Sequence, residues 1–364
     1  MDFVKGWAMI AIVYFHISTG LIFWDGDFPD FIGRGWHVPI FFIVAGFYVK
    51  DDRLRKPIPF LKRKFQTLYV PATIVYVLAI LLHNIFVNIG WYPIGAIHPG
   101  NGNPFHYYEI KDFAICILKA LLCAGSGELV MGAMWFLYVL LYAFVGLSLL
   151  SFGLKVIVKD EKRLMYIRLA LLFALASISC YLSNIVGFTI NRLSQFFIAM
   201  LLIEIGRVIN QKFKWEYTSN YAFIGCILLF LHIIYMLDPT PSLAKNKCSD
   251  LLSLIVGGLC AIYIWAFLYF KLRETIFARC VCYVGRESLY VMMFHILGLF
   301  ICNSFFEYVG YFSDNSPKGM YTYDLNSNPL LIICYLVMGV GFPLLVVCFY
   351  RSLKSYILEM YKQE

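Results

Sequence analysis

The stretch MGAMWFLYVLLYAFVGLSLLSF, residues 131–152, contains no charged side chain and is long enough to cross a lipid bilayer as one α-helix. Similar runs recur near residues 5–24, 36–50, 67–90, 166–186, 194–211, 220–238, 250–270, 287–305 and 329–350. Because 61% of the residues are hydrophobic and only 14% are charged, one water-soluble fold could not bury this much apolar surface. The sequence therefore predicts an all-α, polytopic transmembrane helical bundle of about ten spans, with residues 1–364 forming a single integral membrane domain.

The distribution of the basic residues predicts the orientation of the chain. An even number of spans places both termini on one side of the membrane, and cytoplasmic loops carry an excess of Lys and Arg. With both termini in the cytoplasm, all but seven of the 30 Lys and Arg residues fall on the cytoplasmic side; the exceptions are Arg34, Lys111, Lys119, Arg192, Lys245, Lys247 and Lys318. We therefore expect a multi-pass protein of the inner (cytoplasmic) membrane with N-in, C-in topology. The net charge of +8 is then a topology signal and not a nucleic-acid footprint.

Motifs of several other membrane-protein classes are absent from the sequence. It contains no Walker loop, no G-x-G-x-x-G and no H-E-x-x-H, which argues against an ATP-driven pump and a membrane zinc protease. The 11 cysteines lie mostly in apolar runs at scattered spacings without a CxxC pair, as small core residues do. We expect no metal site, although three histidines could in principle hold zinc.

Polar residues within the apolar runs are the first candidates for function, because a charged side chain there costs roughly 2.5–3.5 kcal/mol. His16 follows Lys5 by eleven residues, about three helical turns, so the two side chains share one face. His37 opens the second run and is expected in the same, external half of the membrane, while His295 lies near the middle of the ninth run. Histidine exchanges protons near neutral pH, which suits acid–base chemistry. The alternative for His16 is a neutral histidine hydrogen-bonded to a neighbouring helix, and the alternative for His37 is an interfacial histidine that faces the lipid headgroups.

Five segments in order along the chain carry a resemblance to one family. They are DFVKG at 2–6 with His16 eleven residues after Lys5, HVPIFFIVAGF at 37–47, KRKFQTLYVP at 62–71, MWFLYVLL at 134–141 and VGRESLYVMMFH at 284–295. This pattern resembles the membrane-bound acyltransferase type 3 family, in particular its sugar O-acetylase branch related to fucose 4-O-acetylases. Two positions depart from the family pattern: Ala45 replaces a Ser before Gly46, and Thr67 stands where a second basic residue commonly follows Arg63.

The resemblance implies a membrane enzyme that takes an acetyl group from cytoplasmic acetyl-CoA and esterifies a sugar hydroxyl. The acceptor would be a cell-surface or exported polysaccharide, or another glycan or lipid-linked sugar, at or beyond the outer face. Neither a metal nor a nucleic acid is implied, and the oligomeric state is left open. Whether an acetyl-histidine forms first or the sugar attacks acetyl-CoA directly is also left open.

The resemblance and the topology together suggest a role for individual residues. We expect His16 to act as the general base, with His37 orienting it or serving in a proton relay. The cations expected at the acetyl-CoA site are Lys5, Lys62, Arg63 and Lys64, because CoA phosphates are anionic. The residues expected at the acceptor are Arg192, Trp135 and His295.

A transporter or flippase for a lipid-linked glycan is the main alternative, since it would also use about ten helices and a positive inner face. Transporters often show two related halves with helix breaks at corresponding positions. Here Pro39, Pro71 and Pro343 fall in no such pairing, so the enzyme is favoured. A receptor is a third alternative, disfavoured by the even number of spans and the histidines within them.

Overall fold

The computed structural model describes residues 1–20, 36–97, 103–123, 127–184, 192–212, 217–236, 250–311 and 330–360. Within these ranges the regular structure is helical, and the sole β-type pairing is an isolated bridge between Ile97 and Pro104. The fold is therefore a helical membrane bundle, as the sequence predicts.

Each predicted span overlaps a helix in the described residues. These helices are α1 (Asp2–Gly20), α2 (His37–Phe47), α5 (Val70–Leu81), α8 (Trp135–Ile157), α9 (Glu161–Asn184), α10 (Leu193–Lys212), α11 (Asn220–Met236), α12 (Leu251–Leu272), α14 (Ser288–Tyr308) and α15 (Leu330–Met360). The remaining elements are α3 (Asp51–Leu54), α4 (Pro57–Lys64), η2 (Phe65–Tyr69), α6 (His83–Asn88), α7 (Ile110–Leu121), η3 (Leu129–Met134) and α13 (Ile276–Arg286).

Seven helical segments of the described chain are long and apolar enough to cross a membrane, and α2 and α11 are shorter apolar helices. The number of spans and the N-in, C-in topology stay predictions.

The third predicted span, 67–90, differs in its boundaries from the helix that forms there. The helix begins at Pro57, widens into a π-helical turn at Phe65–Tyr69 and ends at Leu81, and α6 is a separate short helix. Proline has no N–H to donate and its ring crowds the carbonyl four residues before it, so Pro71 disturbs the α-helical pattern around Thr67. The charged residues at 62–64 interrupt the apolar pattern, so hydropathy alone places the beginning of this helix too late in the sequence.

The chain folds into two compact units, each built from stretches that are separated in sequence. The first unit contains Met1–Ala8, Asp30–Pro71 and Trp135–Cys282, and the second contains Met9–Pro29, Ala72–Met134 and Tyr283–Glu364. Each unit is described on its own below.

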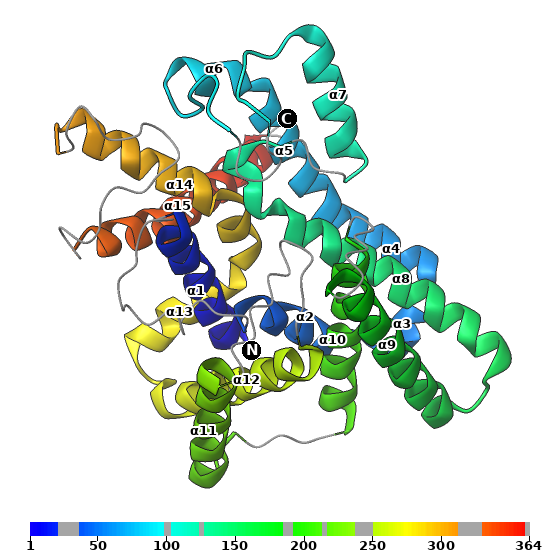
Figure 1. Ribbon diagram of the computed structural model, residues 1–364. Helices are drawn as coiled ribbons and strands as arrows, with labels where there is room; N and C mark the ends of the chain where they lie inside the picture. Colours follow the sequence, from blue (N-terminus) through cyan, green and yellow to red (C-terminus); the bar gives the residue numbers. More distant parts are fainter. Residues whose placement is uncertain are drawn as a thin grey trace. The chain divides into compact units, whose positions relative to one another are not determined.

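In the first unit, α2 packs along α10 (Figure 1). A Cβ atom on Gly46 would overlap the carbonyl oxygen of Ile203, and one on Gly206 would overlap the carbonyl oxygen of Ile43. Small residues let two membrane helices approach this closely. Gly46 of the HVPIFFIVAGF motif is therefore required by helix packing.

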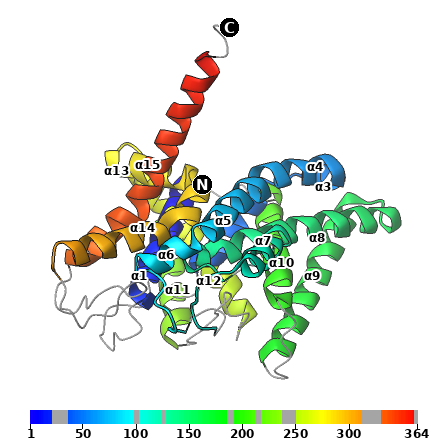
Figure 2. The same cartoon turned by 90° about the horizontal axis from the view of Figure 1, so that it is seen from above.

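In the second unit, α14 and α15 lie side by side in both views (Figures 1 and 2). A Cβ atom on Gly298 would lie 2.6 Å from the carbonyl oxygen of Met338, so the two backbones are in close contact. Gly339 of α15 faces Val13 of α1 and Leu299 of α14 with equally little space. This three-helix contact fixes the parts of α1 and α14 that carry His16 and His295.

Candidate active site

His16 and His295 lie next to each other in the second unit. Their ring centroids are 5.0 Å apart, and the ring planes are tilted by 46°. His295 is fully buried, whereas His16 is half-buried. The structure thus brings together the proposed general base and a histidine that the sequence analysis had placed at the acceptor.

The backbone of α14 determines which nitrogen of His295 carries a proton. Nδ1 lies 2.9 Å from the carbonyl oxygen of Val291 and 3.1 Å from that of Met292. A carbonyl oxygen can only accept, so Nδ1 is the protonated nitrogen and, in the neutral ring, Nε2 keeps its lone pair. Nε2 is buried and has no hydrogen-bond partner among the described residues. An unprotonated imidazole nitrogen next to a second histidine is a chemical arrangement suited to moving a proton.

His37 belongs to the first unit and is buried at the start of α2. Aromatic rings surround this end of the helix: Trp36 lies 6.2 Å from His37 and 6.0 Å from Trp265 by ring centroids, and Trp265 stacks on Trp7 at 4.6 Å. Pro39 occupies the first turn, where its fixed φ angle favours helix initiation. The expected partnership of His37 with His16 stays a prediction.

The basic stretch expected to hold acetyl-CoA forms α4 and the beginning of the π-helical turn. Lys62 and Arg63 are exposed, whereas the ammonium group of Lys64 lies 3.9 Å from the ring centroid of Phe144. Thr67 donates a hydrogen bond from its hydroxyl to the carbonyl oxygen of Arg63, 2.9 Å away. Lys62 and Arg63 are therefore accessible to a ligand from solvent, while Lys64 packs on an aromatic ring.

Lys5, the other cation expected at the donor, is at the beginning of α1. Its ammonium group forms an ion pair with Asp2 at 2.9 Å and lies 5.9 Å from the ring centroid of Tyr48. Because both contacts engage the ammonium group, Lys5 is less available to a phosphate than the exposed Arg63.

The structure also brings together Arg192 and Trp135, two of the residues expected at the acceptor. Both are half-buried, and Nη1 of Arg192 donates to the carbonyl oxygen of Trp135 over 3.4 Å. Arg192 has a φ angle of 65°, an uncommon value for a residue with a side chain. This conformation turns the chain directly before α10 begins at Leu193.

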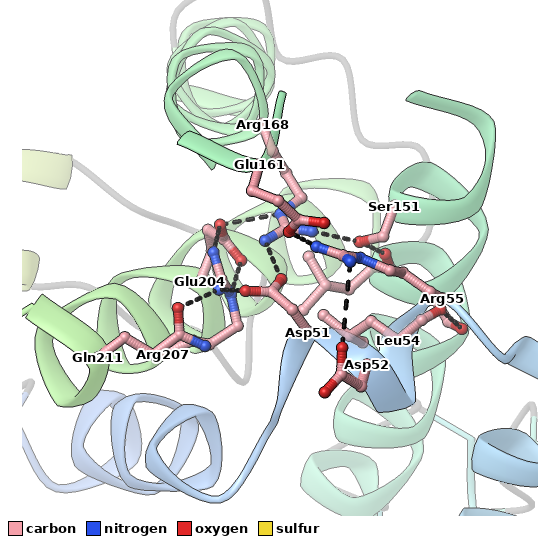
Figure 3. A network of polar contacts seen from close by, with 12 residues as sticks. Asp51, Asp52, Leu54, Arg55, Ser151, Glu161, Arg168, Glu204, Arg207 and Gln211 are labelled. Carbon is pink, nitrogen blue, oxygen red and sulfur yellow. Dashed lines mark hydrogen bonds and ion pairs between the residues drawn. The ribbon is translucent and has the colours of Figure 1, made fainter. Parts of the chain in front are cut away.

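A network of buried charges that the sequence analysis missed joins four helices of the first unit (Figure 3). Arg168 of α9 contacts Glu204 through Nε and Asp51 through Nη2, each at 2.9 Å. Arg207 of α10 contacts Glu204 through Nε at 2.8 Å and Asp51 through Nη1 at 2.5 Å. Ser151 of α8 accepts from Nη1 of Arg168 at 2.8 Å.

The network balances two arginines against two carboxylates. Arg168, Glu204 and Arg207 are each at most 1% exposed, so each charge depends on its partners for solvation. Burial by itself raises the pKa of Asp51, but the neighbouring guanidinium groups of Arg207 and Arg168 outweigh it and hold this pKa below its usual value. Glu204 and Arg207 lie one turn apart in an apolar helix, and this spacing is the feature of the sequence that indicates a buried ion pair. The basic-residue distribution that predicts topology does not reveal it.

The network holds α3 in place. Besides Asp51, Ser148 of α8 donates to the carbonyl oxygen of Leu54 at 3.0 Å, and Arg55 forms an ion pair with Glu161 of α9. Since α4 follows two residues after α3, these contacts also determine where the cations of α4 begin.

Among the described residues, no group of three His, Cys, Asp or Glu side chains is placed as a metal site would require. In the comparisons with known proteins, no curated protein and no solved structure matches the chain. A family described as an acyltransferase domain matches residues 1–348, nearly the whole sequence. This match favours the enzyme over the transporter alternative, and it shows that the chain belongs to the acyltransferase type 3 family of membrane-bound acyltransferases.

Proposed function

We propose that the protein is a membrane O-acetyltransferase that moves an acetyl group from cytoplasmic acetyl-CoA to a sugar hydroxyl of a cell-surface or exported glycan. The observation that carries this proposal is the pair formed by His16 and His295, in which a buried ring nitrogen with a lone pair lies beside the second imidazole. Family membership supplies the reaction class, acyl transfer. The pair supplies the acid–base group that such a transfer to a hydroxyl needs.

In the proposed reaction, His16 takes the proton of the attacking sugar hydroxyl. The hydroxyl oxygen forms a bond to the thioester carbon, the carbon–sulfur bond breaks, and the leaving CoA thiolate receives the proton back from His16. His295 acts as a positioning residue, because its Nε2 can accept a hydrogen bond from protonated His16. A base oriented by a neighbouring group is a general feature of activated nucleophile systems.

The donor side of the proposed reaction uses the exposed cations of α4. Lys62 and Arg63 can form charge-assisted hydrogen bonds with CoA phosphates. The buried network supports this role, because Asp51 and Leu54 tie α3 to three other helices of the first unit. Thr67 in place of a second basic residue leaves Arg63 as the main cation of its motif.

The test is to purify the full chain in lipid nanodiscs and to follow CoA release and acetylated glycan by mass spectrometry. We expect His16→Ala to lower the rate roughly 100- to 10,000-fold while acetyl-CoA still binds. His295→Ala should be similarly damaging, and the double variant should be little worse than His16→Ala, because residues that act as a unit are not additive. His232→Ala, at a histidine given no role, is the control. Full activity of His16→Ala would refute the proposed mechanism.

A further inference from the structure

A cavity of about 270 Å³ lies in the second unit, between α6, α7 and the chain that connects them. This segment follows the possible span Pro57–Leu81 and precedes the next one, Leu129–Ile157, so it lies outside the apolar spans. Its lining includes Tyr108 and Phe105 as aromatic groups and Asp112 and Lys119 as charged groups. The sequence analysis assigned no function to this segment.

The wall of the cavity is held rigidly by reciprocal hydrogen bonds. Asn84 of α6 donates to the carbonyl oxygen of Tyr108 at 3.0 Å, and the Tyr108 N–H donates to the Asn84 side chain at 2.8 Å. Phe105 is held in the same way by backbone bonds with Gly95 at 2.9 Å and Ala96 at 3.0 Å. The described parts of the connecting chain that carry Phe105 and Tyr108 are therefore held in place, which lowers the entropy lost when a ligand binds.

A buried ionisable pair includes one residue of the lining, His83. His83 and Glu128 are 2% and 1% exposed, and Nδ1 of His83 lies 3.0 Å from a carboxylate oxygen of Glu128. Nε2 of His83 donates to the carbonyl oxygen of His106 at 3.0 Å, and the His83 ring stacks on Tyr108 with centroids 3.4 Å apart. One histidine thus holds both the ring of Tyr108 and the backbone of His106. A buried polar group whose hydrogen bonds are all satisfied makes the surrounding structure more rigid.

The lining combines the features that a sugar ring requires. An aromatic face can pack against the C–H face of a pyranose, and the half-buried ring of Tyr108 is the one available for this, since Phe105 is buried and stacks on Tyr92. A sugar hydroxyl both donates and accepts hydrogen bonds. Asp112 supplies an acceptor and Lys119 supplies donors, so neither sign of charge dominates. Pockets for drug-sized ligands measure roughly 300–1,000 Å³, so a cavity below this range suits a single sugar ring.

We propose that this cavity binds one neutral sugar ring of the acceptor glycan. The inference rests on the proposed function for the identity of the acceptor, but sugar binding itself can be tested without any acetyl transfer. The basic stretch lies near the N-terminal end of the possible span Pro57–Leu81, and the segment with the cavity follows its C-terminal end. In the predicted N-in, C-in topology this segment is external, so a sugar bound here would come from the side opposite to cytoplasmic acetyl-CoA.

The experiment measures binding of the methyl glycosides of galactose, glucose, fucose and rhamnose to the full chain by saturation-transfer NMR. Nanodiscs are required, because maltoside detergents carry sugar headgroups that would compete for the cavity. Ile115→Trp fills the cavity from an exposed position of its lining, and Leu118→Trp, exposed on the same helix outside the lining, is its matched control. Lys119→Met removes donors from the lining, and Lys111→Met is the control.

We expect at least one glycoside to bind. Ile115→Trp should abolish this binding, and Lys119→Met should weaken it about ten- to a hundredfold, as expected for a lost hydrogen bond to a charged group. Both controls should bind normally, and acetyl-CoA affinity should be unchanged in all four variants. Absence of glycoside binding, or equal binding by Ile115→Trp and Leu118→Trp, would overturn the inference even if acetyl transfer is found. If acetyl transfer is absent but the binding pattern holds, the proposed function fails while the cavity remains a sugar site.

Discussion

We expect Glu204→Gln to destabilise the first unit strongly, because it removes one charge from the buried network that holds α3. The carboxylate is fully buried and contacts Arg168 at 2.9 Å and Arg207 at 2.8 and 2.5 Å. The substituted amide would retain the shape of the side chain but leave two buried guanidinium groups with one carboxylate, Asp51. Removing one partner of a buried ion pair costs about 3–5 kcal/mol, because the remaining charge is uncompensated.

The assay is thermal unfolding of the purified protein in nanodiscs, followed by circular dichroism. For a cooperative unit of about 150–250 residues, 1 kcal/mol lowers the Tm by roughly 2–4 °C, so Glu204→Gln should lower it by about 6–20 °C. Glu161→Gln is the matched control, because Glu161 also pairs with an arginine but is 61% exposed, and exposed pairs contribute about 0–1 kcal/mol. Removing Arg207 as well, in Glu204→Gln/Arg207→Met, should recover part of the loss. A Tm of Glu204→Gln equal to that of Glu161→Gln would refute the reasoning.

Three further predictions concern acetyl-CoA binding, stability at acid pH and membrane topology. Arg63→Ala should weaken acetyl-CoA binding about 10- to 150-fold in a calorimetric titration, because one charge-assisted hydrogen bond contributes about 1.5–3 kcal/mol. The control Arg273→Ala should bind acetyl-CoA normally. Unchanged affinity in the triple variant of Lys62, Arg63 and Lys64 would place the donor site elsewhere. Because folding lowers the pKa of Asp51, its stabilising effect should be complete at neutral pH and should be lost as the pH falls below the usual carboxyl range, and an acid titration of Asp51→Asn should show a flatter decline. A reporter enzyme fused after Lys56 should be active only inside the cell and one fused after Gly95 only outside; the reverse pattern would contradict the N-in, C-in topology.

The long helices could be predicted from the sequence because most of their apolar runs are long enough to cross a bilayer. The π-helical turn at Phe65–Tyr69 could not, since it depends on how the backbone adapts to Pro71 within a helix that also carries charges. The five motifs identified the family, which the match over residues 1–348 confirms. Helix periodicity, however, describes only one helix at a time and does not state which helices are neighbours.

The candidate site shows, at individual residues, the difference between what one helix reveals and what the packing of several helices determines. The spacing between Lys5 and His16 within one helix makes His16 a candidate. Its neighbour His295 comes from a helix near the other end of the sequence. The close contact of Gly298 with Met338 and of Gly339 with Val13 brings these helices together, and nothing in the local sequence of His16 encodes it. In the same way, His83 and Glu128 become partners only when the chain between them folds back.

The charged network also changes how the basic residues of the predicted cytoplasmic side should be counted. For topology each Lys or Arg counts equally, because the rule concerns the cost of moving a charge across the membrane. For holding an anionic donor only an uncompensated cation counts, and Arg168 and Arg207 are each neutralised by Asp51 and Glu204. Lys64 is turned onto Phe144, whereas Lys62 and Arg63 are exposed to solvent. We therefore expect substitutions of the exposed Lys62 and Arg63 to alter the binding of the proposed anionic donor, and substitutions in the network to alter stability.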